Sequence, residues 1–196
     1  MKVNFRRIWQ IALVMAVLMF IIGMAIAPRD VDLFADKVED LMAKGEYQEA
    51  LKVGEESDKT NRKLLQLRML ALNHEHLLGE RLFKYPITGN GDEFIKKGGD
   101  YELCGLLINK DLDRFVEVLP RYYKIDKQLP RYYKEALIQY NHLRSNRQVN
   151  YEDEVLETDY QDMQRIEQQY SDPKAQQMAV FNHYEGTYWY FYAYLK

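Results

Sequence analysis

The sequence predicts an all-α protein, in which an N-terminal transmembrane helix precedes a domain of α-α helical hairpins. Residues 8–27 form an apolar run without a charged side chain. In the rest of the chain, apolar residues recur three and four positions apart, which is the spacing of one helix face. No segment of the sequence has the pattern of alternating strands separated by hairpin turns. We therefore expect a cytoplasmic tail at 1–7, a transmembrane signal anchor at 8–27 and a helical extracytoplasmic domain at 30–196.

The apolar run is long enough to cross a bilayer, because a helix rises ~1.5 Å per residue. Lys2, Arg6 and Arg7 precede it without an acidic residue, so the positive-inside rule predicts a cytoplasmic N-terminus. Ala25-Ile26-Ala27 has the pattern of a signal-peptidase site. However, the run exceeds the usual signal-peptide core of ~7 to 15 residues, and Pro28 fits a protease-bound strand poorly. We expect an uncleaved anchor, with a secreted form and a buried soluble helix as alternatives.

The predicted domain is acidic and has one cysteine. Four of the 27 basic residues precede residue 30 and all 30 acidic residues lie from residue 30 onward, which leaves a formal charge of -7 on residues 30–196. Binding of nucleic acid is not expected, because it requires clustered Lys and Arg. Cys104, in YELCGLL, is the only cysteine of the chain. It excludes an intrachain disulfide and is expected to be a small core residue.

The domain is expected to begin with a pair of helices. Asp30 or Asp32 can cap the first, which ends near Gly45 and has Phe34, Val38 and Leu41 on one face. A short second helix follows in EYQEALKV.

The text MAKGEYQEAL matches the turn and second helix of a tetratricopeptide unit. Gly45 is at the turn, Tyr47 begins the helix, and Ala50 is the small residue where paired helices approach. YKEAL at 133–137 repeats YQEAL at 47–51, but the separation of 86 residues is not a multiple of the ~34-residue period. Any repeats are therefore degenerate.

The helix expected from Asn61 to Leu82 is the longest and most apolar of the domain and is predicted to form its core. Two apolar stripes run along it: Leu64, Leu67, Ala71 and Leu78, and Leu65, Met69 and Leu72. The proline and glycines of YPITGNGD indicate a loop. Further helices are expected at 101–108 and 112–125.

Capping residues indicate where the later helices begin. Pro130 is expected to open a helix whose buried face has Tyr133, Ala136 or Leu137, and Tyr140. Thr158 and Gln161 fit a capping box for a helix that uses Met163, Ile166 and Tyr170. Ser171-Asp172-Pro173 then supplies the start of a terminal helix.

The chain ends in GTYWYFYAYLK, which is rich in aromatic residues. Such residues are compatible with a membrane-interface belt, a ligand-stacking platform, a strand or a packed helix. The spacing favours a helix, because one continuous stripe runs through Met178, Phe181, Tyr184, Tyr188, Phe191 and Leu195. A strand also fits the alternation of the last residues, but it would have no partner in a helical chain.

Three blocks carry a resemblance: LRMLALNHEHLLGERLFKYP, LPRYYKEALIQYNHLRSN and GTYWYFYAY. They resemble a family of uncharacterised bacterial membrane proteins with a tetratricopeptide-like helical domain. The resemblance implies a bacterial inner (cell) membrane and a periplasmic domain, and it brings no catalytic or binding residues. The chain departs from longer members of that family, which have several membrane spans and more helical repeats.

Two clusters of polar residues are candidate sites. His74-Glu75-His76 is not an HExxH motif, and residues two apart on a helix face different ways, so one metal ion cannot easily be shared. Six carboxylates lie between residues 152 and 162: Glu152, Asp153, Glu154, Glu157, Asp159 and Asp162. They suit Ca²⁺ binding or acid-base catalysis, but they lack the spacing of a calcium loop and are expected to form a solvated loop. We predict no catalytic, cofactor-binding or metal-binding residues and no cofactor.

The leading hypothesis is a membrane-anchored helical scaffold that binds an unknown protein or peptide partner at the cell envelope. The alternative is a small-ligand-binding protein or enzyme with an aromatic and acidic pocket. A closed polar pocket with convergent His, Glu and Arg side chains would favour the alternative.

Overall fold

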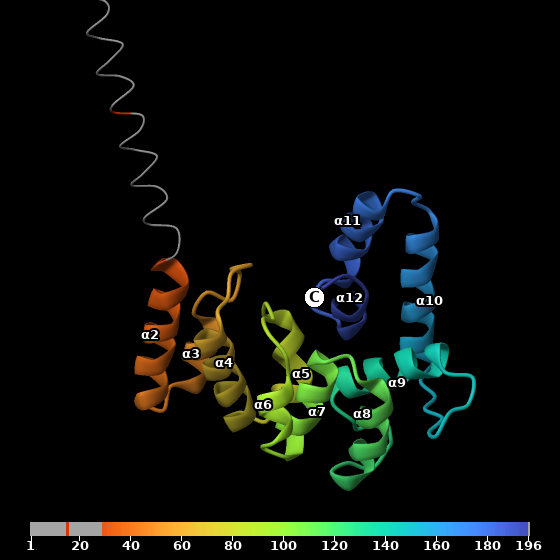
Figure 1. The fold of residues 1–196 in the computed structure, drawn as a ribbon, viewed down its shortest axis with the longest axis horizontal. Helices are drawn as coiled ribbons and strands as arrows, with labels where there is room; N and C mark the ends of the chain where they lie inside the picture. Colours follow the sequence, from red (N-terminus) through yellow and green to blue (C-terminus); the bar gives the residue numbers. More distant parts are fainter. Residues whose placement is uncertain (1–14, 16–28, 196) are drawn as a thin grey trace, which may run out of the picture.

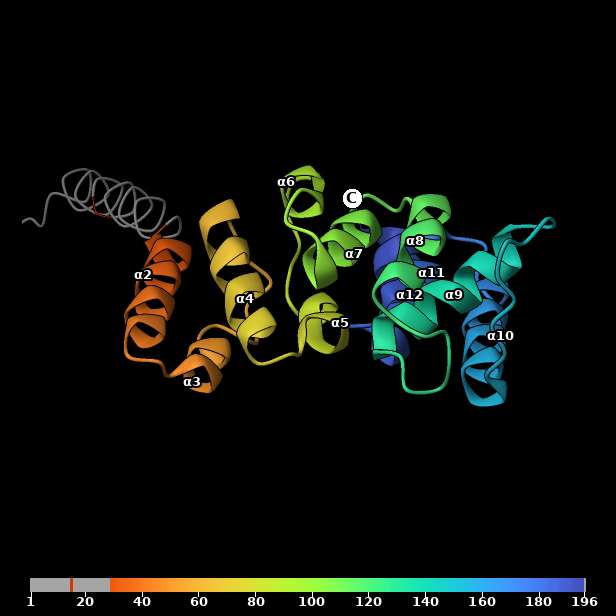
Figure 2. The same cartoon turned by 90° about the horizontal axis from the view of Figure 1, so that it is seen from below.

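Helices follow one another in a curved row along most of the chain (Figures 1 and 2). The computed structural model describes residue 15 and residues 29–195. Every regular element among these residues is a helix, so the predicted all-α class is confirmed. The predicted tail at 1–7 and anchor at 8–27 lie outside the described residues, apart from Met15. Within the described part, no helix combines the length and the apolar character needed to cross a membrane.

The row begins with the predicted helix pair. Helix α2 (Arg29–Ala43) turns at Gly45, whose φ of 78° suits glycine, into α3 (Tyr47–Lys52). Both pack against α4 (Arg62–His74) through a small core of Val31, Ala35, Val38, Ala50 and Leu64. Of the expected face of α2, Val38 is buried, whereas Phe34 and Leu41 are half-buried.

The prediction of one long helix from Asn61 to Leu82 is wrong, because the chain leaves the helix at residues 75–77. Helix α4 ends at His74, and α5 (Leu78–Arg81) and the 3₁₀ helix η1 (Leu82–Lys84) follow in a new direction. His76 has a φ of 57° at the break. The new direction places Gly79 so close to another helix that a Cβ there would lie 2.7 Å from the Cβ of Pro130. The predicted stripes are buried nevertheless, except for the half-buried Leu67.

The middle of the row contains four short elements: α6 (Asp92–Ile95), α7 (Gly99–Ile108), α8 (Leu112–Val118) and the 3₁₀ helix η2 (Leu119–Arg121). Helix α7 confirms the expected helix at 101–108, whereas α6 falls just after the expected loop and was not predicted. The helix expected at 112–125 ends early, at Val118, because Pro120 has no amide hydrogen to continue it.

The last part of the chain contains α9 (Arg131–Leu143), α10 (Glu154–Gln168), α11 (Pro173–Tyr184) and α12 (Tyr188–Tyr194). Pro130 and Asp172 precede helices as predicted, and the Asp172 carboxylate accepts from the amide of Ala175 at 2.8 Å. The prediction of a capping box at Thr158 is wrong, because Asp153 caps α10 and Thr158 lies in the second turn of that helix. Most of the six-carboxylate segment is therefore helical and not a loop.

The aromatic tail is helical, as predicted, but it is not one continuous helix. Residues 185–187 separate α11 from α12, and Gly186 has a φ of 73°. The expected stripe fails at both ends, since Met178 is 60% exposed and Leu195 is 38% exposed. Instead, four consecutive residues of α12 are buried: Tyr188, Trp189, Tyr190 and Phe191. The first turn of α12 is therefore buried on all sides and belongs to the core, whereas Tyr192 and Tyr194 are half-buried and Ala193 is exposed.

Helix α12 lies against the middle of the row. In Figure 1, α10 rises at the far end of the row, and α11 and α12 fold back towards the centre. Helix α12 packs on α9 and on the segment after α5, where the ring of Phe191 lies 4.7 Å from that of Phe83. The main hydrophobic core thus joins residues of α3 to α12.

Substitution of Trp189 tests the break before α12. Because Trp189 is buried, Trp189→Ala should lower the free energy of unfolding by about 3 to 5 kcal/mol. Met178→Ala removes an exposed side chain and should change it by less than about 0.5 kcal/mol. Urea unfolding followed by circular dichroism measures both values. A continuous helix from 173 to 195 would reverse the order, since its buried stripe includes Met178 and excludes Trp189.

Candidate functional site

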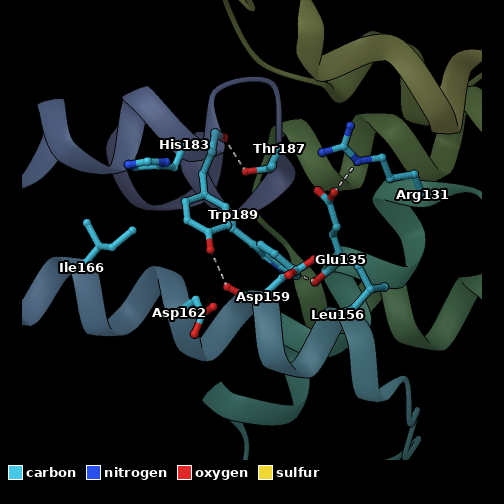
Figure 3. Close-up of a pocket in the computed structure, with 10 residues that line it drawn as sticks. Arg131, Glu135, Leu156, Asp159, Asp162, Ile166, His183, Thr187 and Trp189 are labelled. Carbon is cyan, nitrogen blue, oxygen red and sulfur yellow. Dashed lines mark hydrogen bonds and ion pairs between the residues drawn. The ribbon is translucent and has the colours of Figure 1, made fainter.

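Two clefts adjoin helix α12 on opposite sides. The first, here called the polar cleft, lies between α9, α10 and the α11–α12 turn and has a volume of about 580 Å³ (Figure 3). The second, here called the apolar cleft, lies between α12, the loop after α3 and the segment after α5, and has a volume of about 380 Å³. Thr187 lines both clefts.

Glu135 is the buried charged group of the polar cleft. It lies on the second turn of α9, and only 1% of the residue is exposed. One carboxylate oxygen accepts from the Nε of Arg131 at 2.6 Å, and the other accepts from the amide of Tyr188, also at 2.6 Å. The Glu135 carbonyl accepts from the indole Nε1 of Trp189 at 2.7 Å. Glu135 therefore joins α9 to the first turn of α12 through hydrogen bonds.

Burial has a large effect on the ionisation of Glu135. Loss of hydration raises the pKa of its carboxyl to about 7. The cation of Arg131 and the hydrogen bond from Tyr188 act in the opposite direction and reduce this rise in the pKa. At neutral pH, the group is therefore close to its midpoint of ionisation.

The other wall of the polar cleft comes from α10 and α11. The Tyr184 hydroxyl donates to the carbonyl of Asp159 at 2.9 Å, which joins α11 to α10. Thr187 caps α12 by accepting from the amide of Tyr190 at 3.1 Å, and it donates to the carbonyl of Tyr184 at 2.7 Å. Asp162 forms an ion pair with Arg165 of the same helix.

The polar cleft contains His, Glu and Arg side chains, but they do not converge. Figure 3 shows the ring of His183 pointing away from Arg131 and Glu135. Both carboxylate oxygens of Glu135 already accept hydrogen bonds, one from Arg131 and the other from the amide of Tyr188. The cleft is also open to solvent on one side, with 40% of the Arg131 side chain exposed. This arrangement differs from the closed, convergent pocket that acid-base catalysis requires.

The apolar cleft has aromatic and aliphatic walls. Phe83 and Tyr85 form one side, and Phe181 and Phe191 form the other. Pro86, Ile87 and Phe181 are only half-buried, so they present apolar surface to the cleft. Its surface is mainly apolar, whereas that of the polar cleft is mainly polar. The cleft can therefore accept an apolar group.

Arg68 supports the wall formed by the loop after α3. It lies on α4, has no exposed surface, and donates through Nη2 to the carbonyls of Val53 and Gly54 at 3.3 and 2.8 Å. Its guanidinium carbon lies 4.8 Å from the centre of the Tyr85 ring. One buried cation thus joins the loop after α3 to Tyr85 on the same side of the apolar cleft.

A family model for a family of unknown function, DUF6057, matches residues 96–195. The chain belongs to DUF6057. No curated protein and no solved structure gave a significant match to the chain. The DUF6057 segment contains every residue that lines the polar cleft, whereas the apolar cleft also uses residues 55–58 and 83–87, which precede that segment.

The histidine cluster weighed as a metal site in this DUF6057 protein is spread over the surface. His74 and His76 are both exposed, and His74 stacks on Tyr47 with ring centres 3.7 Å apart. Among the residues that the structure describes, no three His, Cys, Asp or Glu side chains are grouped as metal ligands. Cys104 is buried, as predicted, and burial raises the pKa of its thiol.

The acidic segment has structural contacts. Asp153 caps α10, and Glu157 binds the Nε2 of His142 at 2.7 Å. Of the six residues, only Asp159 and Asp162 line the polar cleft.

Sequence reasoning missed Arg131 and Glu135. One signal was present: Glu135 lies three residues after the buried Tyr132 and one turn after Arg131, so it shares the buried face of α9 with an oppositely charged neighbour.

Glu135→Gln tests the ionisation of the buried carboxyl. The folded pKa is raised above the unfolded value, so the folded state binds the proton more tightly. The associated stability is complete below about pH 4.5 and is lost as the pH rises through about 7. Relative to the Gln variant, the wild type should therefore lose roughly 2 to 3 kcal/mol of unfolding free energy between pH 5 and pH 7.5. Urea unfolding at both pH values measures this difference.

Glu117→Gln is the matched control, because Glu117 forms an exposed ion pair with Arg121 one turn away. Its unfolding free energy relative to wild type should be the same at both pH values. If Glu135→Gln behaved like this control, the buried carboxyl would keep an ordinary pKa.

Proposed function

We propose that this protein is a membrane-anchored helical scaffold that binds a segment of a partner protein in the apolar cleft. The observation that carries the proposal is the cleft itself, which presents aromatic and aliphatic side chains between two separate parts of the fold. Clefts of this kind accept apolar side chains of a partner, and buried aromatic anchors supply much of the affinity in protein interfaces. No reaction is required of such a site.

The order of helix contacts supports a degenerate tetratricopeptide-like scaffold. Helix α2 contacts α3 and α4, α4 contacts α5 and α7, and α7 contacts α8, so each hairpin packs on the next. Repeat scaffolds of this type bind partners on their curved inner surface. Here α12 covers part of the row, and the apolar cleft lies directly beside it.

The apolar run at 8–27 is the basis for proposing a membrane anchor, with the helical domain on the extracytoplasmic side of a bacterial cell membrane. A partner of the cleft would then be another protein of the cell envelope. The second candidate is a small polar ligand in the polar cleft, which the raised pKa of Glu135 favours. The hydrogen bonds from Arg131 and Tyr188 to that carboxylate favour a role in the fold.

The anchor is tested by a reporter enzyme that works only outside the cytoplasm, fused to the C-terminus and expressed in bacterial cells. We expect activity, because the basic residues before the run keep the N-terminus inside. Deleting residues 8–27 is the control and should abolish the activity. An inactive reporter on an intact, full-length fusion would contradict the orientation.

The partner site is tested by photo-crosslinking in cells. A photoreactive phenylalanine analogue replaces Ile87 or Phe181, which are half-buried in the apolar cleft. Val155 on α10 is the control position, since it is 70% exposed and lies outside both clefts. We expect the same discrete crosslinked product from both cleft positions and not from Val155. The same products from all three positions, or none from the cleft, would contradict the proposal.

A further inference from the structure

Acidic side chains lie on two sides of the apolar cleft. Glu55, Glu56 and Asp58 lie on the loop after α3, and Glu185 lies on the opposite wall, in the α11–α12 turn. All four are exposed. Within residues 29–195, none of their carboxylates forms an ion pair or accepts a hydrogen bond, although many other acidic residues of the chain do one or the other. The cleft thus has negative charge available on two walls.

The positive charge at the cleft is smaller. Lys84 is the only basic residue among those that line it, so the lining carries a formal excess of negative charge. Arg68 is nearby, but it is completely buried beneath the loop and bonded to the loop carbonyls. A ligand in the cleft therefore meets four exposed carboxylates and one exposed cation, that of Lys84.

The same cleft has an aromatic lining that suits a cation on an apolar stem. Half-buried Phe181 and Ile87 present apolar surface between the two acidic walls. Lys and Arg side chains place their aliphatic stems on such surfaces and keep the charged end near carboxylates or aromatic faces. A neutral apolar side chain would fill the cleft but leave the carboxylates unpaired, and an acidic one would be repelled.

We propose that the apolar cleft recognises a partner segment that presents a Lys or Arg side chain beside an apolar residue. The apolar residue contacts Phe181 and Ile87, and the cation lies between Glu56 and Glu185. This inference rests on the proposed function, because it specifies the partner of the same site. It adds a charge requirement that the binding of a peptide alone does not imply.

The test is a titration of the full-length chain in detergent micelles with three capped peptides, Gly-Phe-Lys-Phe-Gly, Gly-Phe-Gln-Phe-Gly and Gly-Phe-Glu-Phe-Gly. Methyl resonances of isotope-labelled isoleucines report the site by nuclear magnetic resonance. Ile87 reports the apolar cleft, and Ile166 reports the polar cleft. Assignment uses Ile87→Val and Ile166→Val. We expect the Lys peptide to shift the Ile87 signal and to leave the Ile166 signal in place.

The Lys peptide should bind at least about tenfold more tightly than the Glu peptide at low salt, and the difference should shrink as salt screens the charges. Glu56→Gln with Glu185→Gln should remove most of the preference. Asp40→Asn with Glu154→Gln is the matched control: it removes two exposed, unpaired charges outside both clefts and should leave the preference unchanged.

The outcomes separate this inference from the proposed function. Equal binding of all three peptides at Ile87 would overturn the charge requirement and support the proposed peptide cleft. A shift at Ile166 alone, or none at either methyl, would overturn the inference, while the crosslinking at positions 87 and 181 decides the proposed function independently. Loss of the preference in the control variant as well would assign it to net charge and also overturn the inference.

Discussion

Helix α12 depends on two charged residues that lie far from it in the sequence. The carboxylate of Glu135 accepts from the amide of Tyr188 at the start of the helix. At the other end, the Nζ of Lys110 donates to the carbonyls of Tyr192 and Leu195 at 2.8 and 2.5 Å. The ionised form of Glu135 at the N-terminus and the cation of Lys110 at the C-terminus both match the helix dipole. A helix of seven residues is not stable alone, so these contacts and the buried rings together determine where the C-terminal part of the fold lies.

The position of α12 divides the surface beside it into two unlike clefts. On the side of α9 and α10, the polar groups are largely used to hold the helices together, as Glu135, Tyr184 and Thr187 illustrate. On the side of the loop after α3, the carboxylates form no ion pair or hydrogen bond within residues 29–195, and the apolar side chains between them are partly exposed. We place the proposed partner site there because its carboxylates are unpaired within residues 29–195 and lie beside partly exposed apolar side chains. The family match is consistent with either side, since DUF6057 has no assigned function.

The sequence was sufficient for the helical class and for most of the buried faces. Val38, Leu64 and Tyr133 lie in the core because a periodicity of 3.6 residues places them there. The breaks at His76 and at Gly186 were missed because the apolar spacing continues through both, and only contacts with distant segments require the chain to turn. The close approach of Gly79 to Pro130 is such a contact.

The site residue Glu135 was missed for the same reason: its partners Tyr188 and Trp189 lie more than fifty residues away in the sequence. The apolar cleft likewise combines residues 55–58 with the C-terminal region, and no local pattern connects them.

The location of α12 at the C-terminal end of the fold also affects when the protein can fold during synthesis. The hairpins from α2 to α8 contact mainly their neighbours, so they can form as soon as they leave the ribosome. The apolar faces of α9 and of the segment around Phe83 are not yet covered by α12 at that stage, because α12 follows them in the chain. Until α12 has emerged from the ribosome, the nascent protein therefore exposes an aromatic surface that the folded protein buries, and this interval is when aggregation or chaperone binding is expected.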